Sequence, residues 1–291
     1  MTGVHRPAHS DQTVIGLHRS TNPNPGDRTE MSTASTDKLH VSREGHVAIV
    51  ELRQPPHNFF DLEMIGGVAT AFESLEADPE CRSIVLCAQG TSFCAGADFA
   101  RRDATPRSGG PRMVNPLYAE AIRMASCSKP VVAAVHGPAV GGGLGLAVVA
   151  DFRVTCPEAR FAANFTRLGI HPGFGLTVML PRLVGPQKAA MLFYTGRRIG
   201  GEEAFEIGLA DVLVPRDQVR AKAMELAAEI AASAPLAVQG ARATLRAGLV
   251  EQIRSAVARE SLEQNKNFVS EDFKEGVKAM AERRTPTFVG R

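Results

Sequence analysis

The sequence of 291 residues is poor in aromatic side chains and carries almost no net charge. It has no tryptophan and only two tyrosines, Tyr118 and Tyr194, and its formal net charge is +2. Proteins that bind nucleic acid usually present a basic patch or aromatic rings on which bases stack, so no nucleic-acid partner is expected. No apolar run approaches the roughly 18 residues of a membrane-spanning helix, so no membrane association is expected either.

Cysteine is also scarce, and its spacing argues against two kinds of site. The five cysteines are odd in number and include no C-x-x-C pair, which excludes the usual disulfide framework and zinc site, and no metal is expected. We interpret them as reduced and mostly buried thiols, which predicts a cytoplasmic protein. They are Cys81, Cys87, Cys94, Cys127 and Cys156.

Residues 1–40 differ from the rest of the chain. They are rich in Ser, Thr, Pro, Asn and His and contain no aromatic residue, so they cannot bury enough surface to offset the entropy of ordering. We predict a disordered tail without the apolar segment of a secretory signal. Asp11, Asp27 and Glu30 argue against a mitochondrial presequence. The preferred interpretation is an overextended gene start, with Met31 as the true initiator.

Over the whole sequence, 44% of the residues are apolar. After residue 40, the chain alternates strand and helix patterns. A helix capped by Asp61 follows the first predicted strand, and Leu117–Ala125 also has helical spacing. This alternation predicts an α/β fold with parallel strands over a core of residues 41–215. Residues 216–291 are predicted to be entirely helical. The predicted strands are 46–52, 83–90, 128–137 and 151–156, and the late helices 217–233, 236–248, 250–268 and 271–283.

Two loops that follow predicted strands, residues 92–99 and 136–151, are rich in small residues. In the second loop, Gly141–Gly143 precede an apolar helix. Glycines at a helix start allow another backbone to approach closely and leave N–H donors free at the positive end of the helix. That arrangement suits an anion, or an oxygen that becomes anionic during a reaction. The spacing fits neither a dinucleotide fold nor a P-loop, and tight helix–strand packing is the alternative explanation.

Four motifs in this order resemble the crotonase, or enoyl-CoA hydratase/isomerase, superfamily. They cover residues 44–291 of the chain approximately, and the resemblance implies a spiral of ββα units. It also implies a C-terminal helical region, 216–291, that packs the protein into homotrimers or into hexamers of two trimers. The motifs are SFCAGAD at Ser92–Asp98, AVHGPAVGGG at Ala134–Gly143, TGRRIGGEEAFEIGLADVLVP at 195–215 and SEDFKEGVKAMAERRTPTF at 270–288.

The resemblance also implies a chemistry. Members bind acyl-CoA thioesters, and two backbone N–H groups stabilise the enolate or oxyanion. Carried over to this sequence, these donors are Ala97 and Gly142. Ala95, Arg101 and Arg102 are the expected coenzyme A contacts, with the two arginines as candidates for its phosphates. Coenzyme A enters as part of the substrate, so no separate cofactor is expected.

The sequence departs from the family at two positions that carry the acid–base chemistry of hydratases. Gly145 and Phe165 stand where hydratases have glutamates, and neither residue can transfer a proton. His171, in the loop LGIHPGFG, is the candidate replacement, because a histidine can act as acid or base near neutral pH. The alternative is a loop histidine that is bonded only to backbone groups.

Two classes of function remain open. The preferred interpretation is an acyl-CoA enzyme of this family that catalyses hydration, double-bond migration, C–C cleavage or thioester hydrolysis. The alternative is a catalytically silent protein that binds coenzyme A and has lost the chemistry, for which the missing glutamates argue.

Overall fold

The computed structural model describes residues 28–30, 36–59, 61–97 and 114–291. Its main sheet runs in the order β1-β2-β3-β4-β5-β7-β10. Neighbours from β3 onward pair in parallel, whereas β1, β2 and β3 pair antiparallel. The strands are β1 Arg28–Glu30, β2 Leu39–Glu44, β3 Val47–Leu52, β4 Ser83–Ala88, β5 Val131–Val135, β7 Phe152–Thr155 and β10 Val212–Leu213.

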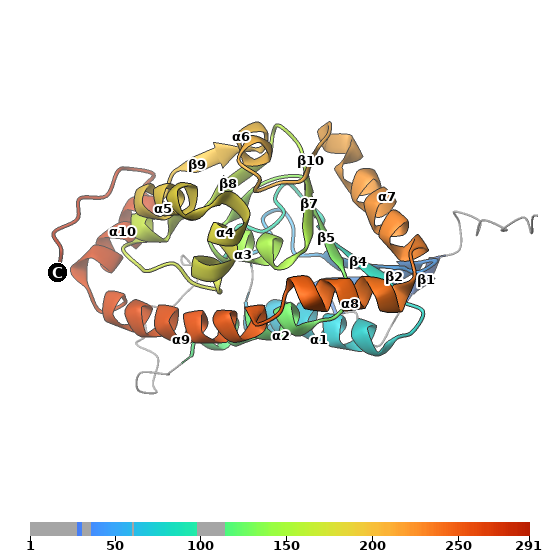
Figure 1. Ribbon diagram of the computed structural model, residues 1–291. Coiled ribbons are helices and arrows are strands. Elements are labelled where there is room, and N and C mark those ends of the chain that lie inside the picture. The colour runs from blue at the N-terminus through green and yellow to red at the C-terminus, as the bar shows by residue number, and fades with distance from the viewer. Residues whose placement is uncertain (1–27, 31–35, 60, 98–113) are drawn as a thin grey trace, which may run out of the picture.

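The parallel core of this sheet confirms the predicted α/β class. Strands β3 and β5 are buried along their whole length, as expected for parallel strands that are covered on both faces. One face is covered by α7 (Val219–Ala232), and α1 (Leu62–Ala77) and α2 (Pro116–Ser126) lie on the other (Figure 1). The side chain of Asp61 accepts a hydrogen bond from Met64 N at 2.9 Å, which confirms it as the cap of α1.

A second, smaller sheet and several short helices were not predicted from the sequence. This sheet has the order β6-β8-β9, and its strands of two or three residues are too short to show a periodicity. They are β6 Ala139–Val140, β8 Arg160–Ala162 and β9 Arg198–Gly200. The helices of this half are α3 Gly142–Val149, η1 Asn164–Leu168, α4 Leu176–Val184, α5 Pro186–Thr195 and α6 Gly201–Glu206.

The C-terminal region is helical as far as Ala281, whereas residues 282–291, which were also predicted to be helical, form no helix. After the short η2 (Arg216–Gln218) and α7 come α8 (Pro235–Leu245), α9 (Leu249–Asn267) and α10 (Glu271–Ala281). Figure 1 shows α8 and α9 end to end along one side of the molecule, where α9 runs beside α2. Among the helices that the structure describes, none is both long and apolar enough to cross a bilayer.

The prediction of disorder for residues 1–40 is wrong for two short pieces. Arg28–Glu30 forms β1 and pairs with β2 from Arg28↔Glu44 to Glu30↔Ser42, and β2 itself begins at Leu39. Pairing at a sheet edge uses backbone N–H and C=O groups, so it does not require the apolar side chains whose absence suggested disorder. Residues 1–27 and 31–35, including Met31, lie outside the described residues.

Candidate active site

The two small-residue loops meet at the N-terminus of α3. Gly96 has φ +78°, and a Cβ on it would lie 2.6 Å from Val140 O and 3.4 Å from Gly142 N. Only glycine fits a position with that backbone and that approach. Ala97 is the next residue after Gly96 in the chain, and Gly142 N lies 3.4 Å from the point where a Cβ of Gly96 would stand.

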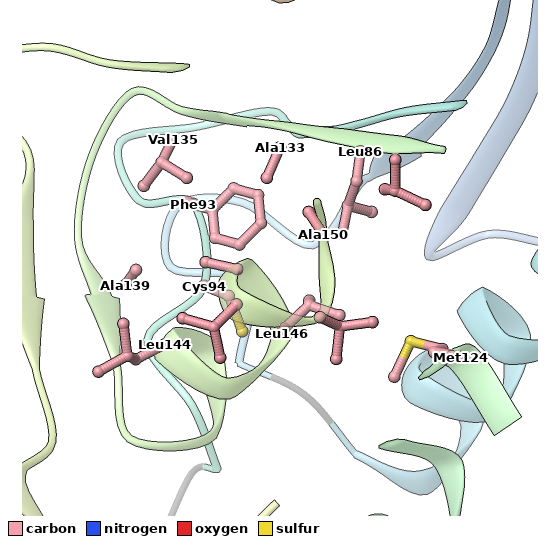
Figure 2. Packing of buried hydrophobic residues seen from close by; sticks show 14 of the residues in the cluster. Leu86, Phe93, Cys94, Met124, Ala133, Val135, Ala139, Leu144, Leu146 and Ala150 are labelled. Carbon is pink, nitrogen blue, oxygen red and sulfur yellow. The ribbon is translucent and has the colours of Figure 1, made fainter. Parts of the chain in front are cut away.

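Hydrogen bonds and buried side chains fasten the loops to each other. Cys94 N donates to Pro138 O at 3.0 Å, and Val140 N donates to Cys94 O at 3.0 Å. The side chains of Phe93 and Cys94 are fully buried, and they pack near Leu144 and Leu146 of α3 (Figure 2). Because Phe93 and Cys94 lie in the core, the loops cannot separate without exposing the apolar surface of these side chains.

Two peptide N–H groups stay available where the loops meet. Gly141 N donates to Ala162 O at 2.8 Å, and the first bond inside α3 runs from Gly145 N to Gly141 O at 3.1 Å. Within residues 36–59, 61–97 and 114–291, by contrast, no acceptor pairs with the N–H of Ala97 or of Gly142. The N–H of Gly142 also lies at the positive end of the α3 dipole, which favours a negatively charged oxygen.

The loop after β3 closes one side of this site. Ala95 N donates to His57 O at 3.0 Å, and the Asn58 amide donates to Gln89 O at 2.6 Å and to Ser92 O at 2.8 Å. The position of Ala95, a predicted coenzyme A contact, is therefore fixed by the hydrogen bond from its backbone N–H to His57 O. The other two predicted contacts, Arg101 and Arg102, lie outside the described residues.

Two phenylalanines occupy the region where the resemblance places glutamates. A Cβ on Gly145 would lie 2.6 Å from Cδ1 of Phe174, which is fully buried and has φ +66°. Phe165 is also buried, and its Cζ lies 3.9 Å from the point where a Cβ of Gly141 would stand. The wall near the N-terminus of α3 is therefore apolar, and no side chain at position 145 fits unless Phe174 moves.

His171 lies against α9, and among the described residues none of its hydrogen bonds reaches the two loops. Its backbone N–H donates to Asn267 Oδ1 at 2.8 Å, and its backbone carbonyl accepts from Gln264 Nε2 at 2.7 Å. Nδ1 lies 2.7 Å from Pro172 O, and because a carbonyl only accepts, Nδ1 carries the hydrogen. In the neutral ring, the lone pair is therefore on Nε2.

A buried polar face of α9 supports the segment from His171 to Thr177, and the sequence analysis missed it. Glu260 accepts from Gly175 N at 2.8 Å, Thr177 N at 3.1 Å and Thr177 Oγ1 at 2.6 Å. Burial raises the pKa of the Glu260 carboxyl above its usual value. The available signal was the spacing, because Ile253, Val257, Glu260 and Gln264 share one helix face and the last two are polar.

A separate cavity of about 590 Å³ opens on the α7 side of the sheet. Its lining includes Cys87 and Ala134 near the ends of β4 and β5, together with His136, Arg216 and Arg220. Burial lowers the pKa of His136, whose Nε2 donates to Gly90 O at 3.1 Å. The four predicted site residues that the structure describes, Ala95, Ala97, Gly142 and His171, do not line this cavity. Among the described residues, no cluster of side chains suits a metal ion.

Comparison with known proteins agrees with this architecture. The family model described as enoyl-CoA hydratase/isomerase matches residues 42–291. The putative enoyl-CoA hydratase/isomerase YngF of Bacillus subtilis is 33% identical over 254 residues, which cover 87% of this chain and 98% of YngF. The probable enoyl-CoA hydratase EchA14 of Mycobacterium tuberculosis is 41% identical over 218 residues, which cover 74% of this chain and 83% of that protein.

A solved structure gives the same result. The enoyl-CoA hydratase/isomerase of Pseudoalteromonas atlantica superposes with a TM-score of 0.78 at 30% identity, over 87% of this chain and all of that chain (100%). The chain therefore belongs to the enoyl-CoA hydratase/isomerase family and has the crotonase fold. It is an acyl-CoA enzyme of that family.

Proposed function

We propose that the peptide N–H groups of Ala97 and Gly142 hold the thioester oxygen of an acyl-CoA substrate as that oxygen becomes anionic. The observation that supports this proposal is the close approach at Gly96, where a Cβ would lie 2.6 Å from Val140 O and 3.4 Å from Gly142 N. Among the described residues, the N–H groups of Ala97 and Gly142 have no acceptor. Donors that are already oriented stabilise the developing charge without reorganisation. In other enzymes, removing one such donor lowers kcat about 100- to 1000-fold.

The proton transfer in this proposal does not use the positions of the usual hydratase glutamates. Gly145 and Phe165 have no ionisable side chain, and the ring of Phe174 fills the space beside Gly145. His171 is the proposed acid or base, because its Nδ1–H is held by Pro172 O and Nε2 keeps a lone pair. His171→Gln then lowers kcat and removes one limb of its pH profile, whereas unchanged turnover removes His171 from the mechanism.

The binding of the nucleotide part follows the family expectation. Ala95, Arg101 and Arg102 are the proposed contacts of coenzyme A, which arrives as part of the substrate, and no further cofactor is proposed. The five cysteines are free and buried, which supports a reducing compartment such as the cytoplasm.

The assembly in this proposal is a homotrimer or a hexamer. Helix α8 has no buried residue, and Leu236 and Leu245 are 83% and 79% exposed on it. Apolar side chains exposed to this degree on one helix favour a contact with another subunit.

Mass spectrometry of a panel of thioesters tests the function. Purified protein is incubated with enoyl-, β-keto- and aryl-acyl-CoA in water and in D2O. A gain of one water with CoA retained indicates hydration or ring opening, deuterium incorporation without a water indicates isomerisation, and free CoA indicates a thioesterase. Thioesters that bind and remain unchanged favour the silent CoA-binding protein instead.

A further inference from the structure

Asn164 lies beside the N-terminus of α3 and is not one of the residues that the family motifs single out. It is the first residue of η1 and is half-buried. Its Oδ1 stands 3.5 Å from the point where a Cβ of Gly141 would lie. On the other side, its Cα is 3.4 Å from the corresponding point of Gly196. The backbone of Asn164 therefore rests against the turn after α5, and its amide is directed towards Gly141.

The side-chain amide of Asn164 has no hydrogen-bond partner among the residues that the structure describes. The amide is not among the fully buried polar atoms that lack a partner, so solvent reaches it when no substrate is bound. The ring of Phe165 borders the same place, since its Cζ lies 3.9 Å from the Gly141 point. The amide is thus a solvent-accessible polar group beside an apolar ring, and it faces Gly141 at the N-cap of α3.

We propose that Asn164 determines specificity by hydrogen-bonding an oxygen substituent, either keto or hydroxyl, on the acyl group of the substrate. An amide offers both an acceptor and donors, so it can pair with either oxygen group. It cannot exchange a proton near neutral pH, so its role is binding and orientation. The inference rests on the proposed function, because it takes the thioester oxygen to lie at Ala97 and Gly142.

The physical reason for selectivity is the cost of an unpaired polar group. When an acyl chain covers the wall, water leaves the amide, and only a substrate with an oxygen in reach replaces that hydrogen bond. A fully hydrocarbon chain leaves the amide unsatisfied, which weakens binding by roughly ten- to a hundredfold.

Binding of two stable acyl-CoA analogues tests the inference. Both carry a methylene between the sulfur and the first carbonyl and have equal chain length, but one has a second carbonyl further along the chain. Calorimetric titration measures both dissociation constants for the wild type, for Asn164→Leu and for Gln187→Leu, which changes an exposed amide on α5. Wild type and Gln187→Leu should prefer the dicarbonyl analogue at least tenfold, and Asn164→Leu should lose this preference.

The outcomes separate this inference from the function on which it rests. Analogues that bind without preference, or a preference that survives Asn164→Leu, overturn the role of Asn164 and leave the acyl-CoA site intact. Failure of both analogues to bind any of the three proteins overturns the site as well. Should Asn164→Leu unfold, Asn164→Ala removes the amide without adding volume, and the same comparison applies.

Discussion

At the residue scale, the contact between Gly145 and Phe174 decides which side chains the site can hold. A Cβ at position 145 would lie 2.6 Å from one ring carbon of Phe174 and 3.1 Å from another. Gly145→Ala therefore overpacks a closed region and should lower the free energy of unfolding by about 1–3 kcal/mol, as measured by urea denaturation.

A double-mutant cycle gives the control for this contact. Phe174→Ala opens the space, so Gly145→Ala should cost less in that background, with a coupling of about 0.5–3 kcal/mol. Gly66→Ala in α1 and Gly240→Ala in α8 are matched controls, since a Cβ at either position meets nothing within 4 Å. Each should raise stability by about 0.5–1 kcal/mol. Additive effects at 145 and 174 would contradict the proposed contact.

The thiols give a second prediction at this scale. Burial raises the pKa of Cys81, Cys87 and Cys94 to about 12 and that of Cys127 to about 11. A thiol with such a pKa is protonated at pH 8 and does not react as a nucleophile. Titration with a disulfide reagent at pH 8 should therefore find these thiols silent in the native protein, and all five cysteines reactive in guanidinium. Rapid native reaction at Cys94 would contradict its burial in the loop.

At the element scale, Glu260 couples α9 to the start of α4. Its folded-state pKa is raised by burial above the ordinary value of 4.5. Between pH 4.5 and the folded-state pKa, the Glu260 carboxyl is protonated in the folded protein and ionised in the unfolded chain. The protonated carboxyl stabilises the folded protein, and this stabilisation is fully present below pH 4.5. It is lost as the pH rises through the folded pKa.

Glu260→Gln tests this coupling because it removes the titration and keeps the volume. The stability advantage of the wild type over the variant should shrink as the pH is raised from about 4.5 towards neutrality. Urea denaturation of both proteins across this pH range measures the difference. An advantage that grows with pH would show that the charged carboxylate is the stabilised form.

The elements also show which features a sequence can predict. Strands β3, β4 and β5 are runs of β-branched and aliphatic residues, and Asp61 is a local cap, so short windows of sequence identified them. The small-residue motifs marked the two loops, whereas the close approach of Gly96 to Gly142 N became evident only in the structure. Contacts between distant segments were missed. His171 is bonded to residues 93 and 96 positions away on α9, and no local pattern encodes that pairing.

At the scale of the whole molecule, the exposed apolar residues of α8 predict the assembly. Leu236 and Leu245 should be covered in a trimer or hexamer, so the wild type should have the mass of three or six chains in light scattering. Leu236→Glu with Leu245→Glu should dissociate it, because charges cannot be buried unpaired. Unchanged circular dichroism checks the fold of the variant, and an unchanged mass would show that α8 is not an interface.

The central claim is that the backbone donors of Ala97 and Gly142 carry the chemistry, and Gly96→Ala tests it most directly. The new Cβ would lie 2.6 Å from Val140 O and force the loops apart, while every side chain of the site remains. With the thioester that the wild type converts fastest, kcat should fall at least about 100-fold and should be unchanged in Gly66→Ala. Equal kcat values in folded Gly96→Ala and wild type would contradict the account, as would a wild type that converts no thioester.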